Sequence, residues 1–309
     1  MSIQPHRANL TLDPILCGLE VQPPAELKRV HPAAFACSTK DVMERYRFAL
    51  WQALEVAEAE ALRGTKSLYS ALLALENLLM SDILTIDEQE ALLRDTTMAG
   101  FGPRSWKLFV ELELAIEKNL VLLFSNRQTS NLLLKRPANV MNNYLSRFEI
   151  LVRKEINLAR IGPDSDVLMI GSGYFPSTAI ELARQVACQV NCVDFVSEAV
   201  TTSHGLITSM GLDDHISVQR ARGEEIDCGR YHAIIVGCLA QPKQRIMANL
   251  AATTRPEARI VCRTTLGTRS FMWKPVQGHE LAPYRLTQYF RAIGTQHLSS
   301  MLLELDNRE

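Results

Sequence analysis

The second half of the chain alternates short apolar runs with stretches in which apolar positions have helical spacing. The apolar runs of strand length occupy residues 167–170, 188–193, 216–221, 231–239 and 258–264. A helical pattern begins at about Ser177, and further helical stretches occupy residues 196–210 and 244–253. Strands that alternate with helices predict a parallel, doubly wound α/β sheet. Residues 286–290 and 298–305, separated by Gly294, predict a closing antiparallel pair of strands.

The first half has a different pattern, in which apolar residues recur at helical spacing. This pattern covers residues 41–62, 67–79, 87–93, 106–124 and 139–157, whereas residues 1–40 are rich in proline and irregular. An Ile-Gly-Pro-Asp sequence at 161–164 marks a break before the first strand. We therefore predict an all-α N-terminal domain over 1–160 and a Rossmann-like nucleotide-binding domain over 161–309. The helical domain is expected at the carboxyl ends of the strands, where it would close the site.

The sequence DVLMIGSGYFPSTAIELA, residues 166–183, indicates a strand, a glycine turn and a helix. Gly171 and Gly173 permit a sharp bend and a close approach of a ligand to the backbone. Asp194 ends the next apolar run about 20 residues later, where its carboxylate can accept hydrogen bonds from a ribose diol. Pro176 stands where a dinucleotide motif has its third glycine. The pattern favours a mononucleoside ligand, and S-adenosylmethionine above all.

A second acidic segment, Arg-Gly-Glu-Glu at residues 222–225, follows the third apolar run. An acid at this place can accept a hydrogen bond from the amino group of adenine. We therefore assign the cofactor site to Gly171, Ser172, Gly173, Asp194, Phe195, Gly223 and Glu224. The alternative interpretation is that the acids of this set, and Glu225 beside them, are solvated residues at strand ends.

Composition and charge set wider limits. A chain of 309 residues with 47% hydrophobic content has room for two domains and a sizeable core. The net charge of −1 gives no basic footprint for nucleic acid or a membrane surface. The seven scattered cysteines predict buried thiols in a reducing cytosol rather than a zinc site. The start of the sequence lacks an apolar signal core, and charged residues interrupt the apolar stretch 106–124, so we expect a cytoplasmic protein without a membrane span.

Three segments, in order along the chain, resemble the nicotianamine synthases. VLMIGSGYFPST at 167–178 is similar to their glycine turn, and RTTLGTRSFMWKP at 263–275 is similar to the segment after their fifth strand. Asn143, Tyr144 and Leu145 resemble an Asn-Tyr-Leu in the helix before their first strand. The resemblance covers the second half well, and the first half only in helical character and in that helix. It implies a sheet of the class I methyltransferase type, and it adds Tyr144 to the cofactor-binding residues.

The resemblance also implies an unusual use of S-adenosylmethionine, as a substrate. An amine attacks the γ-carbon of the aminocarboxypropyl arm in an in-line displacement that releases 5′-methylthioadenosine. In nicotianamine synthases and the related opine-metallophore synthases, the amine belongs to a second amino acid or a second cofactor molecule. In the related azetidine-2-carboxylate synthases it is the cofactor's own α-amine, and for a cyclase the resemblance implies a role in secondary metabolism.

This chain has Tyr174 and Phe175 where the nicotianamine synthases have Pro-Leu. A tyrosine ring beside the sulfonium would stabilise that cation by about 0.5–2 kcal/mol and would fill the space of a second amine. The helical half shows no obvious cluster of polar anchors for an acceptor carboxylate. We therefore expect intramolecular cyclisation to azetidine-2-carboxylic acid, with transfer to an amine acceptor as the alternative. A small-molecule methyltransferase and a nucleoside-binding module without catalysis are the other classes.

Tyr174, Asn139 and Ser203 are the candidate catalytic residues. The Tyr174 hydroxyl could accept from the α-ammonium and help to take its proton, Asn139 could hold the amine or carboxylate, and Ser203 could reach the amine. The simpler interpretations are a packing aromatic at a turn, a helix N-cap and a serine on a helix face. His204 is interpreted as a surface or satisfied core histidine.

Several further residues have two interpretations each. Asn143 and Tyr144 match the family's motif but could belong to the core. Arg263 and Arg269 could pair with a carboxylate, or they could tie the fifth strand to neighbouring loops. Trp273 could face the ligand or cap the core. The residues predict no metal site, even though the relatives make products that bind metal.

Overall fold

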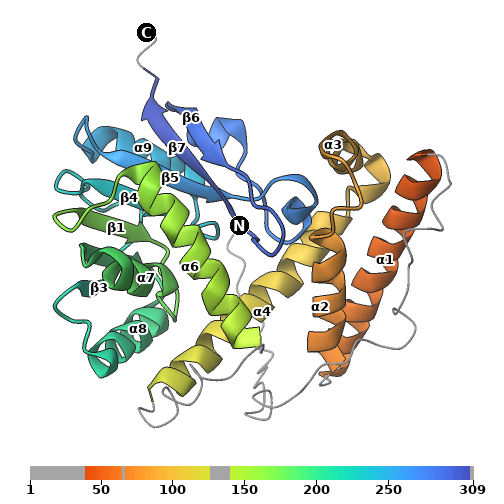
Figure 1. Cartoon of the computed structure of the whole chain (residues 1–309), viewed down its shortest axis with the longest axis horizontal. Coiled ribbons are helices and arrows are strands. Elements are labelled where there is room, and N and C mark those ends of the chain that lie inside the picture. The colour runs from red at the N-terminus through yellow and green to blue at the C-terminus, as the bar shows by residue number, and fades with distance from the viewer. Residues whose placement is uncertain (1–38, 65–66, 126–139, 307–309) are drawn as a thin grey trace.

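The structure, a computed structural model, describes residues 39–64, 67–125 and 140–306 (Figure 1). Its second half contains a seven-stranded sheet in the order β3-β2-β1-β4-β5-β7-β6. β1 to β5 are parallel, and β7 is antiparallel to both β5 and β6. The doubly wound sheet and the closing antiparallel pair predicted from the sequence are confirmed. The strands are β1 (Asp166–Ile170), β2 (Gln189–Asp194), β3 (Ile216–Arg220), β4 (Ala233–Val236), β5 (Arg259–Thr264), β6 (Tyr284–Phe290) and β7 (Ser299–Leu305).

The strand order reverses between β1 and β4. From β1 the chain moves outward to β2 and β3, and it then returns to β4 on the other side of β1. Ligands of open α/β sheets bind outside the carboxyl ends of the strands at such a switch point. β4 covers only the middle of the predicted run 231–239, because residues 238–239 already form a turn.

Alternate residues of the strands pack against helices on opposite faces of the sheet. Val167 and Met169 of β1 share a core with α6 (Val140–Ala159), α7 (Ser177–Val186) and α8 (Ser197–Met210). Leu168 and Ile170 of the same strand share a second core with α9 (Lys243–Thr253). Both faces are therefore covered, which explains why the strands read as continuous apolar runs.

The described part of the first half is helical. α3 begins with a capping box, in which Thr85 and Glu88 each accept a backbone N–H of the other. α4 begins earlier than the predicted residue 106, because Pro103 is tolerated in the first turn of a helix. No helix in the described ranges is long and apolar enough to cross a membrane. The elements are α1 (Thr39–Arg63), α2 (Ser67–Leu79), α3 (Ile86–Arg94) and α4 (Phe101–Phe124), with 3-10 turns at Thr96–Met98, Gly267–Phe271 and Gly278–Leu281.

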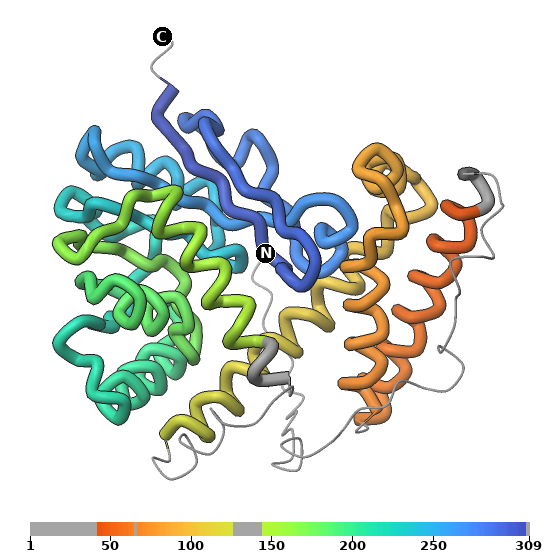
Figure 2. Tube along the Cα trace, in the orientation of Figure 1, coloured from red at the N-terminus to blue at the C-terminus, as the bar shows by residue number. Residues whose placement is uncertain are grey.

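α4 joins the two parts of the molecule. Figure 2 shows it in yellow, running diagonally between the sheet and the pair formed by α1 and α2. Ile116 and Leu120 in its C-terminal half belong to the core on the α6 side of the sheet, whereas Leu108 and Phe109 belong to the core of the helical part. α6 precedes residue 160 and yet packs on the sheet. The division into two domains at residue 160 stays a prediction.

A buried ion pair joins Arg263 of β5 to Glu155 of α6. Nε and Nη2 of Arg263 donate to the two oxygens of the Glu155 carboxylate at 2.9 and 2.7 Å, and the side chains are 3% and 0% exposed. Ser300 of β7 also donates to Glu155 at 2.6 Å, and Arg263 donates to Thr178 of α7 at 2.9 Å. Every charge in this cluster is hydrogen-bonded, and the cluster fixes α6 and α7 on the sheet. Arg263 therefore ties β5 to its neighbours.

We predict that Arg263→Met lowers the free energy of unfolding by about 3–5 kcal/mol, because the buried Glu155 carboxylate loses its countercharge. Urea unfolding followed by circular dichroism measures the change. The control is Arg285→Met, which breaks an exposed pair with Glu304 and should change the free energy of unfolding by less than about 1 kcal/mol. Equal effects of the two substitutions would contradict the role of the buried pair.

Candidate active site

The turn after β1 brings backbone and carboxylate groups into a space that only glycine allows. Gly171 has φ +80° and Gly173 has φ +71°, in the region that favours glycine. A Cβ on Gly171 would meet the Cβ of Ala240 at 3.0 Å. A Cβ on Gly173 would meet Oε2 of Glu117 at 2.5 Å. A side chain at Gly173 would therefore be strained by the positive φ and would displace the Glu117 carboxyl group from the turn.

Asp194 links the ends of β1 and β2. Its Oδ2 accepts the backbone N–H of Gly173 at 3.0 Å, and its Oδ1 accepts the backbone N–H of Val196 at 3.0 Å. Phe195 lies beside it and is 57% exposed. The sequence placed Gly171, Gly173 and Asp194 in one site, and the structure brings them together.

Glu117 of α4 lies largely buried against the glycine turn. Its Oε2 accepts the backbone N–H of Tyr174 at 2.9 Å, and its Oε1 accepts the hydroxyl of Tyr144 at 3.4 Å. Burial and the nearby carboxylate of Glu113 raise the pKa of Glu117 to about 8. A carboxyl group with this pKa can exchange a proton near neutral pH.

Tyr174 lies between two charged side chains. Its hydroxyl donates to Oε2 of Glu198 on α8 at 2.8 Å, and Nζ of Lys118 lies 4.5 Å from the centroid of its ring. Nζ of Lys118 is also 3.3 Å from the carboxylate of Glu198. Burial, together with the hydrogen bond and negative charge of Glu198, raises the pKa of Tyr174 above its usual value. The hydroxyl therefore stays protonated, and the ring face binds a cation.

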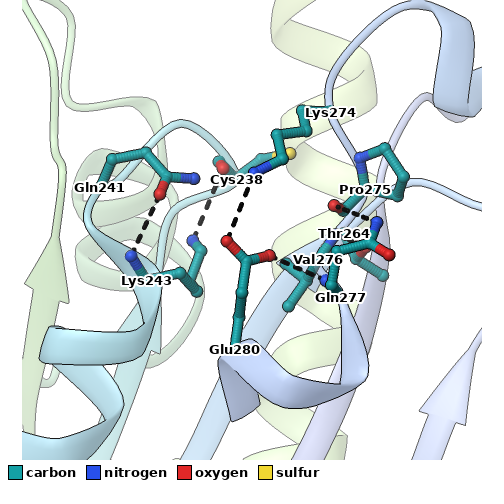
Figure 3. Close-up of polar contacts among 9 residues, drawn as sticks. All are labelled: Cys238, Gln241, Lys243, Thr264, Lys274, Pro275, Val276, Gln277 and Glu280. Carbon is teal, nitrogen blue, oxygen red and sulfur yellow. Dashed lines mark hydrogen bonds and ion pairs between the residues drawn. The ribbon is translucent and has the colours of Figure 1, made fainter. Parts of the chain in front are cut away.

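The turn after β4 lies next to the glycine turn at the same edge of the sheet. A Cβ on Gly237 would meet the carbonyl oxygen of Gly171 at 3.1 Å. Lys243, the first residue of α9, is 1% exposed. Its Nζ donates to the carbonyl oxygen of Gly237 at 2.7 Å. It also donates to the carbonyl oxygen of Cys238 at 3.5 Å, as Figure 3 shows. This buried ammonium ties the turn after β4 to the first residue of α9.

The remaining predicted cofactor residues have local explanations. A Cβ on Gly223 would meet Cγ2 of Ile170 at 2.6 Å, so close packing alone requires glycine there. The carboxylate of Glu224 lies 3.8 Å from Nη1 of Arg222. Ser172 is buried within the turn. Their roles toward a ligand stay predictions.

Of the other two candidate catalytic residues, the structure describes only Ser203. Ser203 lies on the buried face of α8, and its hydroxyl donates to the carbonyl of Val200 at 3.2 Å. Asn139 lies outside the described residues, as does the side chain of Asn143. His204 is exposed, as the surface interpretation expects.

Arg269 and Trp273 have structural partners. Nε and Nη2 of Arg269 donate to the carbonyl oxygens of Gln296 and Gly294, both at 2.8 Å. Trp273 is buried between Phe109 and the ring of His297. Arg269 ties the segment after β5 to the loop before β7, and Trp273 caps the core of the helical part.

The cysteines that the structure describes are free and buried, as predicted. They are Cys188, Cys192, Cys228, Cys238 and Cys262, whereas Cys17 and Cys37 lie outside the described residues. No group of three His, Cys, Asp or Glu side chains placed to hold a metal ion occurs within the ranges that the structure describes.

The sequence analysis missed Glu117, whose charge it used only to exclude a membrane span. A signal was present. Glu113 and Glu117 are four residues apart, so they share one face of the helix. Ile116 and Leu120 on α4 are buried. The two acids border the apolar stripe of the helix, where a neighbouring element can enclose them.

Comparison with known proteins identifies the group to which these features belong. The family model described as Nicotianamine synthase protein matches residues 108–300. Among curated proteins, an L-histidine 2-aminobutanoyltransferase of Pseudomonas aeruginosa is 27% identical over 147 residues, which is 47% of this chain and 56% of that protein. One of Yersinia pestis is 30% identical over 134 residues, covering 43% of this chain and 50% of that protein. The chain thus spans about half the length of these relatives.

Solved structures share the fold at lower identity. A structure of MtNAS in complex with MTA and tNA has a TM-score of 0.76 at 20% identity, covering 88% of this chain and 100% of that chain. A structure of an MtNAS mutant in complex with S-adenosylmethionine has a TM-score of 0.73 at 21% identity, covering 87% and 99%. These similarities confirm the Rossmann-like sheet with its helical N-terminal part.

We predict that Gly173→Ala destabilises the protein by about 1–3 kcal/mol, because the residue has a positive φ and the new Cβ collides with Glu117. Thermal unfolding measures the loss. Gly205→Ala is the control, since it lies within α8 with nothing within 4 Å of a new Cβ. It should be neutral or stabilising by up to about 1 kcal/mol. A neutral Gly173→Ala would mean that Glu117 does not press on the turn.

Proposed function

Since the chain belongs to the nicotianamine synthase family, we propose that it uses S-adenosylmethionine as the donor of a 3-amino-3-carboxypropyl group. This substrate supplies an electrophilic γ-carbon: an N–C bond forms there, the C–S bond breaks, its electron pair goes to sulfur, and 5′-methylthioadenosine leaves. The attacking amine must lose its ammonium proton to a base. The cluster of Glu117, Tyr144 and Tyr174 at the glycine turn is the observation that carries this proposal.

We assign nucleoside binding to the edge formed by the glycine turn and Asp194. Each carboxylate oxygen of Asp194 accepts one backbone N–H and keeps a second lone pair, with which it can accept from a ribose hydroxyl. The exposed ring of Phe195 offers an apolar surface next to it. MtNAS structures with the same fold hold S-adenosylmethionine in one case and MTA in the other, which supports the assignment.

We propose Glu117 as the group that takes the proton. Its pKa of about 8 suits proton exchange near neutral pH. Tyr174 is less suited, because its pKa is raised and its hydroxyl already donates to Glu198. Its ring, which binds the ammonium of Lys118 in this structure, is the part that suits a cationic substrate. Asn139 and Ser203 stay candidates for holding the amine.

For the nucleophile we propose the α-amine of the same S-adenosylmethionine molecule, which closes a four-membered ring and yields azetidine-2-carboxylic acid. An amino acid acceptor would bring a carboxylate that needs a cationic anchor. Arg263 and Arg269, the arginines considered for that part, bind Glu155 and backbone carbonyls instead. Tyr174 and Phe175 also fill the turn with two aromatic side chains, both buried.

The alternative is transfer of the group to an amino acid. The curated relatives are named L-histidine 2-aminobutanoyltransferases, and this favours histidine or a similar acceptor. Because the similarity spans about half of each relative, it supports the family and leaves the acceptor to experiment.

We predict that the purified protein, given S-adenosylmethionine alone, forms 5′-methylthioadenosine and azetidine-2-carboxylic acid in equal amounts over many turnovers. Mass spectrometry of both products measures this. A protein that stays inactive until histidine or another amino acid is added would refute cyclisation in favour of transfer. S-adenosylhomocysteine as the main nucleoside would refute aminocarboxypropyl chemistry altogether.

We predict that Glu117→Gln lowers kcat by about 10²–10⁴-fold, because an amide cannot take the proton from the amine. Glu111→Gln, which removes an acid from the same helix, is the control and should keep the activity. Tyr174→Phe should retain more activity than Glu117→Gln, since it preserves the ring. Initial rates of 5′-methylthioadenosine release measure all three. Wild-type rates for Glu117→Gln would remove Glu117 from the proton path.

A further inference from the structure

Arg147 of α6 occupies a buried position between α4, α6 and the loop before β7. Its Nη2 donates to Oε2 of Glu113 on α4 at 2.7 Å, and each of these side chains is 14% exposed. Its Nη1 contacts Nδ1 of His297, whose Nε2 lies 3.0 Å from Oε1 of Glu76 on α2. Its guanidinium carbon lies 4.5 Å from the centroid of the Tyr144 ring. One cation thus binds a carboxylate and covers the ring that contacts Glu117.

Glu113 lies one helical turn before Glu117 on α4. Residues four apart share a face of the helix, so the two carboxylates are neighbours. A negative charge at this distance disfavours ionisation of the second carboxyl group. After burial itself, Glu113 is the largest cause of the raised pKa of Glu117. The pKa of Glu117 therefore depends on where the Glu113 carboxylate is held.

Other groups also face Glu117 and contribute to its environment. The backbone N–H groups of Tyr174 and Phe175 favour its ionised form, whereas the charge of Asp194 disfavours it. The titratable and charged groups around it are Glu113 and Lys118 on α4, Tyr144 and Arg147 on α6, Tyr174 in the glycine turn, Asp194 at the end of β2, Glu198 on α8, His297 before β7 and Glu76 on α2.

We propose that Glu113 and Arg147 are positioning residues for the base. Arg147 holds the carboxylate of Glu113 beside Glu117 and packs on the ring of Tyr144, and this arrangement sets the pH at which Glu117 takes up a proton. The inference rests on the role given to Glu117 in the proposed function. Both residues act through Glu117 and Tyr144 rather than on the reacting atoms.

The direction of each effect follows from the charges. Glu117 takes a proton from the amine only when it is ionised, so activity falls as pH drops below its pKa. Removing the charge of Glu113 lowers that pKa and extends activity to lower pH. Removing Arg147 leaves the negative charge of Glu113 without its countercharge. This raises the pKa of Glu117 and confines activity to higher pH.

The first test is the pH dependence of kcat in the full-length protein. In Glu113→Gln, the ratio of kcat at about pH 6.5 to kcat at about pH 8.5 should rise about threefold or more, since one pKa unit changes the protonation ratio tenfold. In Arg147→Met the ratio should fall by a similar factor, and the double variant should lie between the two. Arg147→Lys keeps the charge and should stay near wild type. Glu111→Gln is the control for removing an acid from α4 and should leave the profile unchanged.

A purely structural role would give another result. It would lower kcat by the same factor at every pH and leave the acid limb of the profile in place, and that outcome overturns the inference. Arg147→Met removes a buried cation and carries the risk of misfolding. Glu113→Gln keeps an oxygen that accepts a hydrogen bond from Arg147, so it removes the charge and preserves the contact. The pH profile of this variant alone therefore distinguishes a positioning role from a structural one.

The second test needs no activity. Infrared titration follows the carboxylic acid band that Glu117→Gln removes, and its midpoint should lie at lower pH in Glu113→Gln than in wild type. An unchanged midpoint refutes the inference, even if 5′-methylthioadenosine is formed. A shifted midpoint in a protein that forms no 5′-methylthioadenosine from S-adenosylmethionine, with or without amino acids, upholds the pairing and refutes the proposed function alone.

Discussion

The contact on which the site depends is that between a carboxylate of α4 and the glycine turn after β1. Oε2 of Glu117 accepts the N–H of Tyr174 at 2.9 Å, and it lies so near Gly173 that no Cβ fits between them. This contact requires α4 to lie across the carboxyl ends of the strands. It also requires α6 to stay on the sheet, where Tyr144 reaches Glu117, and the buried pair of Glu155 and Arg263 holds α6 there.

Burial changes the pKa of the carboxyl group in this contact. A carboxyl group in water is ionised at neutral pH and has little tendency to take a proton. Removed from water and placed beside a second carboxylate, Glu117 has a pKa of about 8. The same surroundings suit a cationic substrate, because Asp194 and Glu198 lie on neighbouring elements and Lys118 already rests on the ring of Tyr174. Proton uptake and cation binding therefore arise from one arrangement of acids and aromatic rings.

The fold alone leaves the reaction open, since similar sheets serve many chemistries. What separates the candidate reactions is a small set of side chains at the turn. Tyr174 and Phe175 are both buried at the turn, whereas Arg263 and Arg269 bind Glu155 and backbone carbonyls within the protein. We propose that the volume and charge left beside Glu117 decide between cyclisation and transfer.

The sequence by itself determined the elements and the edge at which they form a site. Continuous apolar runs located the strands and helical spacing located the helices, because these patterns are local. The spacing from Gly171 to Asp194 placed these two residues at one edge of the sheet. The sequence did not determine which side chains meet there. Glu117 and Tyr174 are 57 positions apart, and Glu155 and Arg263 are 108 apart. Only the packing of α4 and α6 decided these pairs, because the pKa of a carboxyl group and the partner of a buried charge depend on neighbours that the local sequence does not contain.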